Sequence, residues 1–390
     1  MIDYSKVLSE KVTQIKPSGI RKFFDIAATM DDVISLGVGE PDFQTPWVVR
    51  KAGIASLERG KTKYTSNSGL EVLREEISKY LERKYSLSYD PKDEIFVSIG
   101  GSEAIDAAIR AVVNVGDEVI IPQPSYVCYE PITALAGGVP VIIELEAEDN
   151  FKLTPEKLRA AISDKTKALI LPFPCNPTGA IMEREDLEAI AQILRDTDIV
   201  VISDEIYSEL TFGGRHVSMA SIEGMRERTI TVNGFSKAFS MTGWRLGYAG
   251  GPREIIKQMV KIHQFAIMCA PTVSQYAAVE ALRSCDDAVA DMVAEYNRRR
   301  RLIVDGFNRA GLTCREPKGA FYAFPSIKST GMTSEEFCEK LLEKSHVAVV
   351  PGTAFGKGGE GFIRASYCYS TEHIIEALRR IEEFVKEIKK

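Results

Sequence analysis

The middle of the chain carries six short runs of apolar, mostly β-branched residues. Each run is nearly continuous, which is typical of strands buried on both faces of a sheet. Helical patterns lie between the runs, and this alternation predicts an α/β fold with a mostly parallel sheet covered by helices. The predicted strands are residues 117–124, 139–145, 167–174, 198–205, 228–237 and 246–251, and the predicted helices include residues 102–113, 154–162 and 184–195.

The last third of the chain has a different pattern, in which long helices surround short apolar runs. Residues 288–310 predict one long charged helix, and Thr371–Lys390 predicts a final amphipathic helix. Between them, GAFYAFPSI, HVAVVPG and GFIRASYCY predict strands of an α+β segment. The basic run Arg298–Arg301 spreads around the first helix, so we expect a solvated face there and no nucleic-acid patch.

Composition and charge narrow the class of protein. The net charge of the 390 residues is −6, which gives no basic nucleic-acid footprint. No apolar run approaches the roughly 20 residues that span a bilayer, and the N-terminal residues lack a signal-peptide core. Seven scattered cysteines without a C-x-x-C pair, and four dispersed histidines, indicate neither a disulfide framework nor a zinc site. We expect a cytoplasmic protein without nucleic-acid or membrane partners.

Chemically versatile residues follow several predicted strands at their carboxyl ends, where open α/β sheets bind ligands. Asp204 and Tyr207 follow one strand, and Asp204 is either functional or a helix N-cap. Lys237 follows another, and a lysine in such a place suits a Schiff base. Arg245 and Ser236 predict a phosphate clamp, because a guanidinium binds phosphate bidentately. The alternative is a surface lysine with a structural arginine.

Two further turns contain candidate binding residues. Gly100–Gly101 separates a strand from a helix that begins near Ser102, and the free N–H groups of such a helix start bind phosphate. A simple capped turn is the alternative. Asn176, between two prolines, suits one directed hydrogen bond or a tight turn. The run GKGGEG matches a dinucleotide-binding pattern, but no helix is predicted after it, so that function is excluded. The acidic residues 144–149 predict a solvated loop.

Taken together, these motifs resemble the class I aminotransferases of the gamma subgroup, which are fold-type I pyridoxal-5′-phosphate (PLP) enzymes. The resemblance covers nearly the whole chain and is strongest to prokaryotic aromatic-amino-acid aminotransferases, with aspartate and N-acetyl-diaminopimelate aminotransferases close behind. It implies a homodimer with shared sites, a large domain at residues 46–284 with a mostly parallel seven-stranded sheet, and a small α+β domain at 1–45 with 285–390. The motifs are SGIRKFFDIAA, LGVGEPDFQTP, KYTSNSG, PSYVCY, PCNPTG, SDEIY, NGFSKAFSMTGWRLGY, GAFYAFP and FIRASY.

The resemblance also assigns catalytic and cofactor-binding roles at matching positions. Lys237 is similar to the Schiff-base lysine that shuttles the proton between Cα and C4′. Asp204 is similar to the carboxylate that pairs with the pyridinium nitrogen, so that PLP acts as an electron sink. The remaining cofactor residues are implied to be Tyr207 and Asn176 at O3′, Tyr126 stacked on the ring, and Gly101, Ser102, Ser236 and Arg245 at the phosphate, with Tyr64 reaching the phosphate of the neighbouring subunit.

The resemblance also implies which residues bind the substrate and which donor is preferred. Arg364 is similar to the arginine that clamps the α-carboxylate, and Gly39 presents backbone to the same group beside Asn176. Relatives that prefer aspartate often carry lysine where this chain has Ser102. We therefore expect an aromatic L-amino acid as donor and a 2-oxo acid such as 2-oxoglutarate as acceptor, in a ping-pong reaction. The apolar walls are expected from the segment 15–24, at Ile20, Phe23 and Phe24.

Other functions stay open at this stage. An aspartate or N-acetyl-diaminopimelate-type aminotransferase fits the same motifs. A PLP-dependent C–S lyase fits the same scaffold, because Lys237, Asp204 and Arg364 serve that chemistry equally. A PLP-binding regulator is the third alternative, and the lack of basic character argues against a DNA-binding protein.

Overall fold

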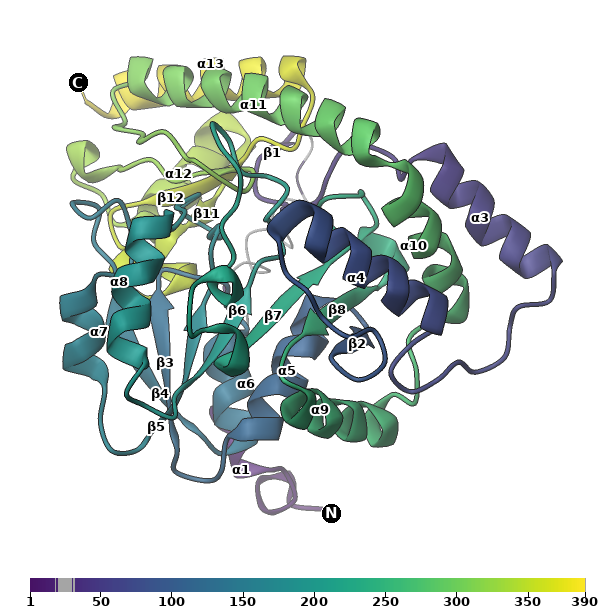
Figure 1. Cartoon of the computed structure of the whole chain (residues 1–390). Helices are drawn as coiled ribbons and strands as arrows, with labels where there is room; N and C mark the ends of the chain where they lie inside the picture. The colour runs from purple at the N-terminus through teal and green to yellow at the C-terminus, as the bar shows by residue number, and fades with distance from the viewer. Residues whose placement is uncertain (18, 20–29, 31, 390) are drawn as a thin grey trace.

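The computed structural model describes residues 1–17, 19, 30 and 32–389, and its centre is a seven-stranded sheet (Figure 1). The strand order is β2-β8-β7-β6-β5-β3-β4, and every neighbouring pair is parallel except those that β8 makes with β2 and β7. The predicted α/β fold with a mostly parallel sheet is therefore confirmed. The strands are β2 (Ile95–Ser98), β3 (Glu118–Gln123), β4 (Val139–Glu144), β5 (Thr166–Leu171), β6 (Val200–Asp204), β7 (Thr229–Gly234) and β8 (Gly247–Gly250).

Burial along these strands explains why the sequence pattern was informative, and where it failed. All residues of β7 and β8 are buried, as their continuous apolar runs predicted. The same expectation is wrong for β4, where only Ile143 is buried. β4 has a single neighbour, β3, and lies at the edge of the sheet, so much of its surface faces solvent.

Helices cover both faces of this sheet. On one face, α5, α6 and α9 enclose a core that includes Ile105, Ile202 and Met259. On the other face, α7 and α8 pack on β3 and β5 through residues such as Leu158 and Leu187. α4 and α10 cover the β2–β8 side (Figure 1). The helices are α3 (Trp47–Glu58), α4 (Glu71–Tyr85), α5 (Gly101–Val112), α6 (Tyr129–Ala136), α7 (Pro155–Ala161), α8 (Arg184–Leu194), α9 (Arg253–Ala266) and α10 (Thr272–Ser284).

Local sequence signals mark where several helices begin. Thr154 caps α7 by accepting a hydrogen bond from the Lys157 N–H, and Pro155 occupies the first helical position. α8 begins with a reciprocal capping box between Glu183 and Asp186. The predicted helices 154–162 and 184–195 are thus confirmed, with ends within one or two residues.

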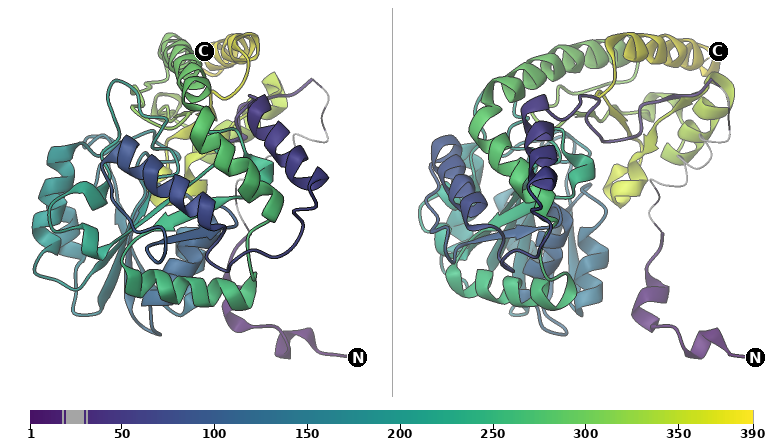
Figure 2. Two further views of the ribbon diagram at one scale, coloured as in Figure 1. Left: turned by 45° about the vertical axis from the view of Figure 1, so that its right-hand side comes forward. Right: turned by 90° about the vertical axis from the view of Figure 1, so that its right-hand side faces the viewer.

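The C-terminal part forms a smaller α+β layer. β9 (Tyr322–Ala323), β11 (Val350–Pro351) and β12 (Ile363–Ser366) make a three-stranded antiparallel sheet. β10 (Val347–Ala348) pairs in parallel with β1 (Ile34–Ser35), which ties the N-terminal segment to this layer. The long helices α11 (Asp286–Arg309) and α13 (Thr371–Ile388) run together along one side of the molecule, opposite the N-terminus (Figure 2). The remaining elements are α1 (Glu10–Gln14), α12 (Ser334–Ser345), and the 3₁₀ turns Tyr4–Lys6, Met219–Ser221, Arg226–Arg228, Thr242–Trp244, Lys328–Thr330, Gly352–Phe355 and Lys357–Gly359.

The basic run on α11 is only half solvated. Arg298 and Arg301 are exposed, as predicted, whereas Arg299 and Arg300 are buried. Arg299 Nη1 contacts both carboxylate oxygens of Asp42 at 2.8 Å, and Arg300 Nη1 lies 2.6 Å from Glu316 Oε1. The prediction of a fully solvated face is therefore wrong, because α11 packs against neighbours on two sides and its inner arginines form ion pairs there.

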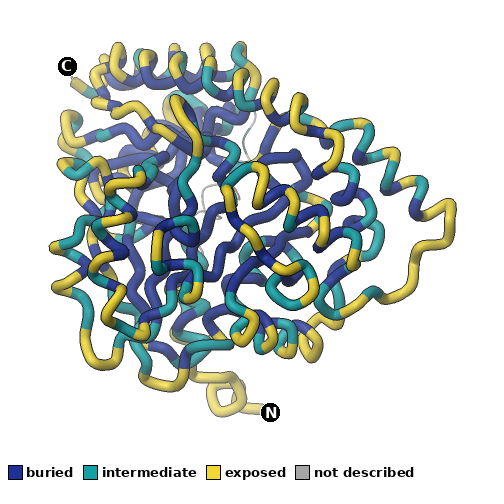
Figure 3. The backbone as a smooth tube through the Cα atoms, viewed as in Figure 1, coloured by how far each residue is buried: buried dark blue, intermediate teal, exposed yellow. Residues whose placement is uncertain are grey.

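Burial is concentrated at the sheet (Figure 3). The strands are mostly buried, and exposed residues follow the outer helices and the N-terminus. Within the described part of the chain, no helix is long and apolar enough to cross a membrane. The cysteines are unpaired thiols.

Candidate active site

A pocket of about 510 Å³ opens at the carboxyl ends of β5, β6 and β7, between the sheet and the C-terminal layer. The N-terminal segment 37–40 and strand β12 complete its walls. Open α/β sheets bind ligands at this edge. The structure brings together every predicted site residue except Tyr64: Gly39, Gly101, Ser102, Tyr126, Asn176, Asp204, Tyr207, Ser236, Lys237, Arg245 and Arg364 all line the pocket.

Lys237 follows β7 by three residues, and its amine points into the pocket. Nζ donates a hydrogen bond to the Gly39 carbonyl at 2.7 Å and lies 5.7 Å from the centre of the Phe321 ring. Burial lowers the pKa of Lys237 to about 8, because a charged amine loses hydration there. A neutral amine, which is the nucleophilic form, is therefore far more accessible than on a surface lysine. The alternative of a surface lysine is wrong.

Asp204 ends β6 and lies at the bottom of the pocket, 7% exposed. Its Oδ2 accepts a hydrogen bond from the Tyr129 hydroxyl at 2.7 Å, and its Oδ1 accepts one from the Ile206 N–H at 3.2 Å. Burial raises the pKa of Asp204, and the bond from Tyr129 opposes that rise. A turn follows Asp204 rather than a helix, so the N-cap alternative is wrong.

Tyr129 is a site residue that sequence reasoning did not single out. It begins α6 and lies three residues after Tyr126, within the motif PSYVCY. The two rings meet edge to face at 5.9 Å. Tyr126 precedes α6 and Tyr129 is its first residue, and only the fold revealed that the Tyr129 hydroxyl reaches Asp204.

The opposite end of the pocket is made of backbone and an exposed cation. Gly100 caps α5 with φ of +79°, and a side chain at this position would meet Arg245 Nη2 at 2.8 Å. Only glycine fits there. The first N–H groups of α5 have no acceptor within the helix, so they are available to an anion. Arg245 is itself fixed by a hydrogen bond from Nη1 to the Thr242 carbonyl at 3.0 Å.

Arg364 and Asn176, which are 188 residues apart, are joined by a hydrogen bond. Arg364 Nη1 donates to Asn176 Oδ1 at 2.9 Å, and Nη2 donates to the Gly37 carbonyl. The guanidinium is buried and lies 4.5 Å from the centre of the Tyr322 ring. Its Nε has no partner among the described residues. A buried, unpaired donor on a fixed guanidinium is suited to an anionic ligand.

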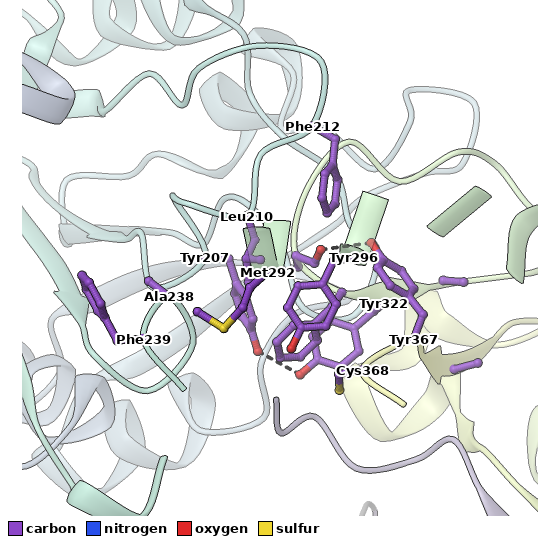
Figure 4. Packing of buried hydrophobic residues seen from close by; sticks show 14 of the residues in the cluster. Tyr207, Leu210, Phe212, Ala238, Phe239, Met292, Tyr296, Tyr322, Tyr367 and Cys368 are labelled. Atoms are coloured by element: carbon purple, nitrogen blue, oxygen red, sulfur yellow. Dashed lines mark hydrogen bonds between the residues drawn. The ribbon is translucent and has the colours of Figure 1, made fainter. Parts of the chain in front are cut away.

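Tyr207 and Tyr322 lie side by side under the pocket. Their hydroxyls are 2.8 Å apart and hydrogen-bonded, as Figure 4 shows. Burial raises the pKa of both phenols, so they stay neutral. Tyr322 lies in the motif GAFYAFP and had no role assigned from the sequence.

One predicted residue, Tyr64, is not brought to this pocket. Tyr64 is 81% exposed and lies elsewhere on the surface of the single chain. Ile20, Phe23 and Phe24 lie outside the described residues. The GKGGEG run forms a 3₁₀ turn that leads into β12, so its exclusion as a dinucleotide motif is confirmed.

Comparison with known proteins agrees with this geometry. The family of class I and II aminotransferases matches residues 31–381. A putative aminotransferase of Bacillus subtilis is 54% identical over 97% of this chain and 98% of its own. An aspartate aminotransferase of Pyrococcus abyssi is 47% identical over 98% of this chain and 99% of its own length. The crystal structure of an aromatic aminotransferase from Pyrococcus horikoshii superposes with a TM-score of 0.90 at 46% identity. The match covers 95% of this chain and 99% of that one.

Proposed function

The chain belongs to the class I and II aminotransferases, a family of PLP-dependent, fold-type I enzymes that transfer amino groups, and we propose that the pocket described above is its active site. The observation that carries the proposal is the meeting of Lys237, Asp204 and Arg364 in one pocket. We further propose an aromatic L-amino acid as preferred donor and 2-oxoglutarate as acceptor.

The residues of the pocket fit PLP by charge and shape. Arg245 and the N–H groups that begin α5 suit its phosphate, and the unpaired Nε of Arg364 suits a substrate carboxylate. The carboxylate of Asp204 suits the protonated pyridine nitrogen. When bound, PLP supplies an electron sink for the charge that develops at the substrate Cα.

Lys237 is proposed to have two tasks. Its amine, with a pKa of about 8, would hold the cofactor covalently. The same Nζ, when released by a substrate amine, would be placed to carry a proton between Cα and C4′. The Gly39 carbonyl, 2.7 Å from Nζ in this structure, keeps the amine at the centre of the pocket.

Asp204 is proposed to keep the pyridine nitrogen protonated. A buried carboxylate is ionised only when a partner offsets the lost hydration, and a pyridinium N–H is such a partner. Tyr129 holds the second oxygen of Asp204, which fixes the orientation of the carboxylate. Tyr126 is proposed to stack on the ring, and Tyr207 and Asn176 to bind O3′.

Arg364 is proposed to hold the α-carboxylate of every substrate, with Gly39 and Asn176 beside it. The bond to Asn176 and the bond to the Gly37 carbonyl fix the guanidinium before substrate arrives. Preorganisation of this kind lowers the entropy lost on binding. Arg364→Lys is therefore expected to impair all donors alike, which steady-state kinetics with phenylalanine and aspartate measures.

The aromatic preference is supported by the uncharged Ser102 at the pocket edge. Burial of an aromatic ring stabilises a complex by about 25 cal/mol per Å², whereas an acidic side chain finds no lysine at Ser102. Values of kcat/KM for phenylalanine, tyrosine and aspartate with 2-oxoglutarate test this proposal. Equal or better use of aspartate, or activity confined to a diaminopimelate-type donor, would contradict the preference and leave the family assignment intact.

A homodimer with shared sites is also proposed. Tyr64 is exposed, and Trp47, Phe265, Ile267 and Met268 are further large apolar side chains exposed on the single chain. Asn67 Nδ2 donates to the Met268 carbonyl at 2.8 Å, which joins the Tyr64 loop to the segment after α9. Large apolar side chains left exposed on a single chain are frequent at protein–protein contacts, and we propose that Tyr64 reaches the phosphate held by the partner.

Mixing two inactive variants tests the shared site. Lys237→Ala chains mixed with Tyr64→Phe chains are expected to recover activity, because the site that takes Lys237 and Arg245 from the Tyr64→Phe chain receives a native Tyr64 from its partner. Each variant mixed with itself is the control and is expected to stay inactive. A fully active monomer in light scattering would contradict the shared site.

The division into a large domain at 46–284 and a small domain at 1–45 with 285–390 is part of the same proposal. The seven-stranded sheet lies wholly within the first range, and the β1–β10 pair joins both parts of the second. The unpaired cysteines support a cytoplasmic location, since reduced thiols are typical of reducing compartments.

A further inference from the structure

The half-buried Glu103 and the fully buried His263 form a pair behind the β2–α5 turn, and neither residue has a part in the chemistry described above. We propose that this pair is a positioning device that holds the turn Ile99–Gly101 in its phosphate-binding shape. The inference rests on the proposed binding of the PLP phosphate at the start of α5. It gives a role in phosphate affinity to two residues that both lie outside the pocket lining.

The turn needs support because its own residues provide none. Gly100, which caps α5, has no side chain to accept the N–H groups of the first helical turn. Gly101 follows it, and glycine is the residue with the largest conformational freedom. A turn with two adjacent glycines keeps a defined shape only if its surroundings fix it.

Glu103 supplies one such contact from inside the helix. Its Oε2 accepts a hydrogen bond from the Ile99 N–H at 2.7 Å. The carboxylate of the third helical residue thus binds backward to the residue before the cap, as in one half of a capping box. This bond fixes the start of the turn and leaves the N–H groups of Gly101 and Ser102 for a ligand.

His263 fixes the other oxygen of the same carboxylate. Its Nδ1 lies 2.9 Å from Glu103 Oε1, and its side chain is fully buried on α9. The ring also meets Phe96 of β2 edge to face at 4.9 Å. With both oxygens engaged, Glu103 is held in one orientation by two different elements, α9 and the end of β2.

Two contacts enclose the turn from its remaining sides. A Cβ at Gly247 of β8 would meet the Gly100 backbone at 2.6 Å, so the strand presses directly against the turn. Arg245 approaches Gly100 from the pocket side. The turn is therefore held from below by β8, from the pocket by Arg245 and from behind by the Glu103–His263 pair.

The expected effect is specific to phosphate, which separates positioning from general stability. Loss of the Glu103–Ile99 hydrogen bond loosens the N–H groups that bind phosphate, while the ring end of the pocket keeps its contacts. We expect Glu103→Ala to raise the dissociation constant of PLP for the apoenzyme about tenfold, the value of one hydrogen bond. The dissociation constant of pyridoxal, which lacks the phosphate, is expected to change less than twofold.

The experiment is a fluorescence titration of each full-length apoprotein with PLP and with pyridoxal. The quantity compared is the dissociation constant of pyridoxal divided by that of PLP, which falls when phosphate binding weakens. Glu103→Gln is expected to restore the wild-type ratio, because the amide oxygen still accepts from the Ile99 N–H. His263→Phe keeps a ring against Phe96 and removes the donor, so its ratio is expected to fall between those of wild type and Glu103→Ala. His216→Asn is the matched control. It breaks a second buried histidine–carboxylate pair, at 2.9 Å from Glu205, away from the turn, and the ratio is expected to stay unchanged.

Three results would overturn the proposal. A wild-type ratio in Glu103→Ala and His263→Phe, with a reduced ratio in Arg245→Ala, removes the positioning role and keeps the phosphate site. An unchanged ratio in Arg245→Ala as well means that phosphate binds elsewhere, and the proposed site fails too. An equal loss in Glu103→Gln and Glu103→Ala would assign the effect to charge rather than to the hydrogen bond. If Glu103→Ala does not fold, Glu103→Gln and His263→Phe still decide the question.

Discussion

The two ends of the pocket are built on different physical principles. At the ring end, Asp204 and Lys237 are removed from water, and burial shifts both of their pKa values toward the neutral form. At the end proposed to bind phosphate, Arg245 is exposed to solvent, and the backbone N–H groups of Gly101 and Ser102 are further donors that line the pocket. Burial therefore adjusts reactivity at one end, while fixed geometry anchors the ligand at the other.

This difference predicts how substitutions at each end behave. At the ring end, a change of one group alters the protonation of its neighbours, so effects on rate are large. At the phosphate end, donors act on a fixed anion, so effects fall on affinity.

Substitution of Lys237 by alanine is expected to give the largest effect. The variant is expected to bind PLP without a covalent bond and to lose turnover by on the order of 10⁴-fold or more, because nucleophile and proton carrier disappear together. Borohydride reduction of the wild type, followed by peptide mapping, is expected to mark Lys237. A label on another lysine would contradict the assignment.

Asp204→Ala is expected to reduce the rate by about 10²–10³-fold, because the charge at Cα loses its preorganised partner. PLP retention is expected to change much less, since the phosphate end is intact. Asp204→Asn is the control of equal size without the charge. Single-turnover rates and bound-cofactor content measure the two effects separately. Turnover near that of the wild type would exclude the role of Asp204.

The lowered pKa of Lys237 predicts a pH dependence. The neutral amine is the reactive form, so attachment of PLP to the apoenzyme is expected to speed up about tenfold per pH unit below pH 8 and to level off above it. Between about pH 8 and 10.5 the unfolded chain binds a proton at this lysine that the folded chain lacks, so stability is expected to rise with pH there. Stopped-flow absorbance measures the rate of PLP attachment at each pH. A midpoint of the pH–rate profile near 10.5 would mean that the Lys237 amine is solvated like that of a surface lysine.

Tyr129→Phe is expected to have the smallest effect at the ring end, a loss of about tenfold in kcat, which is typical of one hydrogen bond to a charged group. Without that donor the pKa of Asp204 rises further, so the acidic limb of the pH profile is expected to move to higher pH. Tyr126→Phe is the comparison variant, because the Tyr126 hydroxyl makes no bond to Asp204 among the described residues. Identical acidic limbs in both variants would remove Tyr129 from the mechanism.

Much of the fold and site was predictable from the chain alone. The continuous apolar runs located the central strands, and the rule that ligands bind at carboxyl ends of parallel strands gathered residues as distant as Asp204 and Lys237. Arg364 and Asn176 were both assigned to the substrate carboxylate by resemblance. Their hydrogen bond was not predictable, because a separation of 188 residues leaves no periodic signal.

The sequence by itself determined which elements form and which residues are able to do chemistry, since apolar period, glycine turns and capping residues are local properties of the chain. Tertiary structure alone decided the environment of those residues. It buried Arg299 and Arg300 on a helix whose pattern indicated a solvated face. It left β4 at an edge, and it joined Glu103 to His263 behind the β2–α5 turn. Burial and ion pairing depend on which elements pack together in space, and these contacts buried Asp204 and Lys237 at one end of the pocket and left Arg245 exposed at the other.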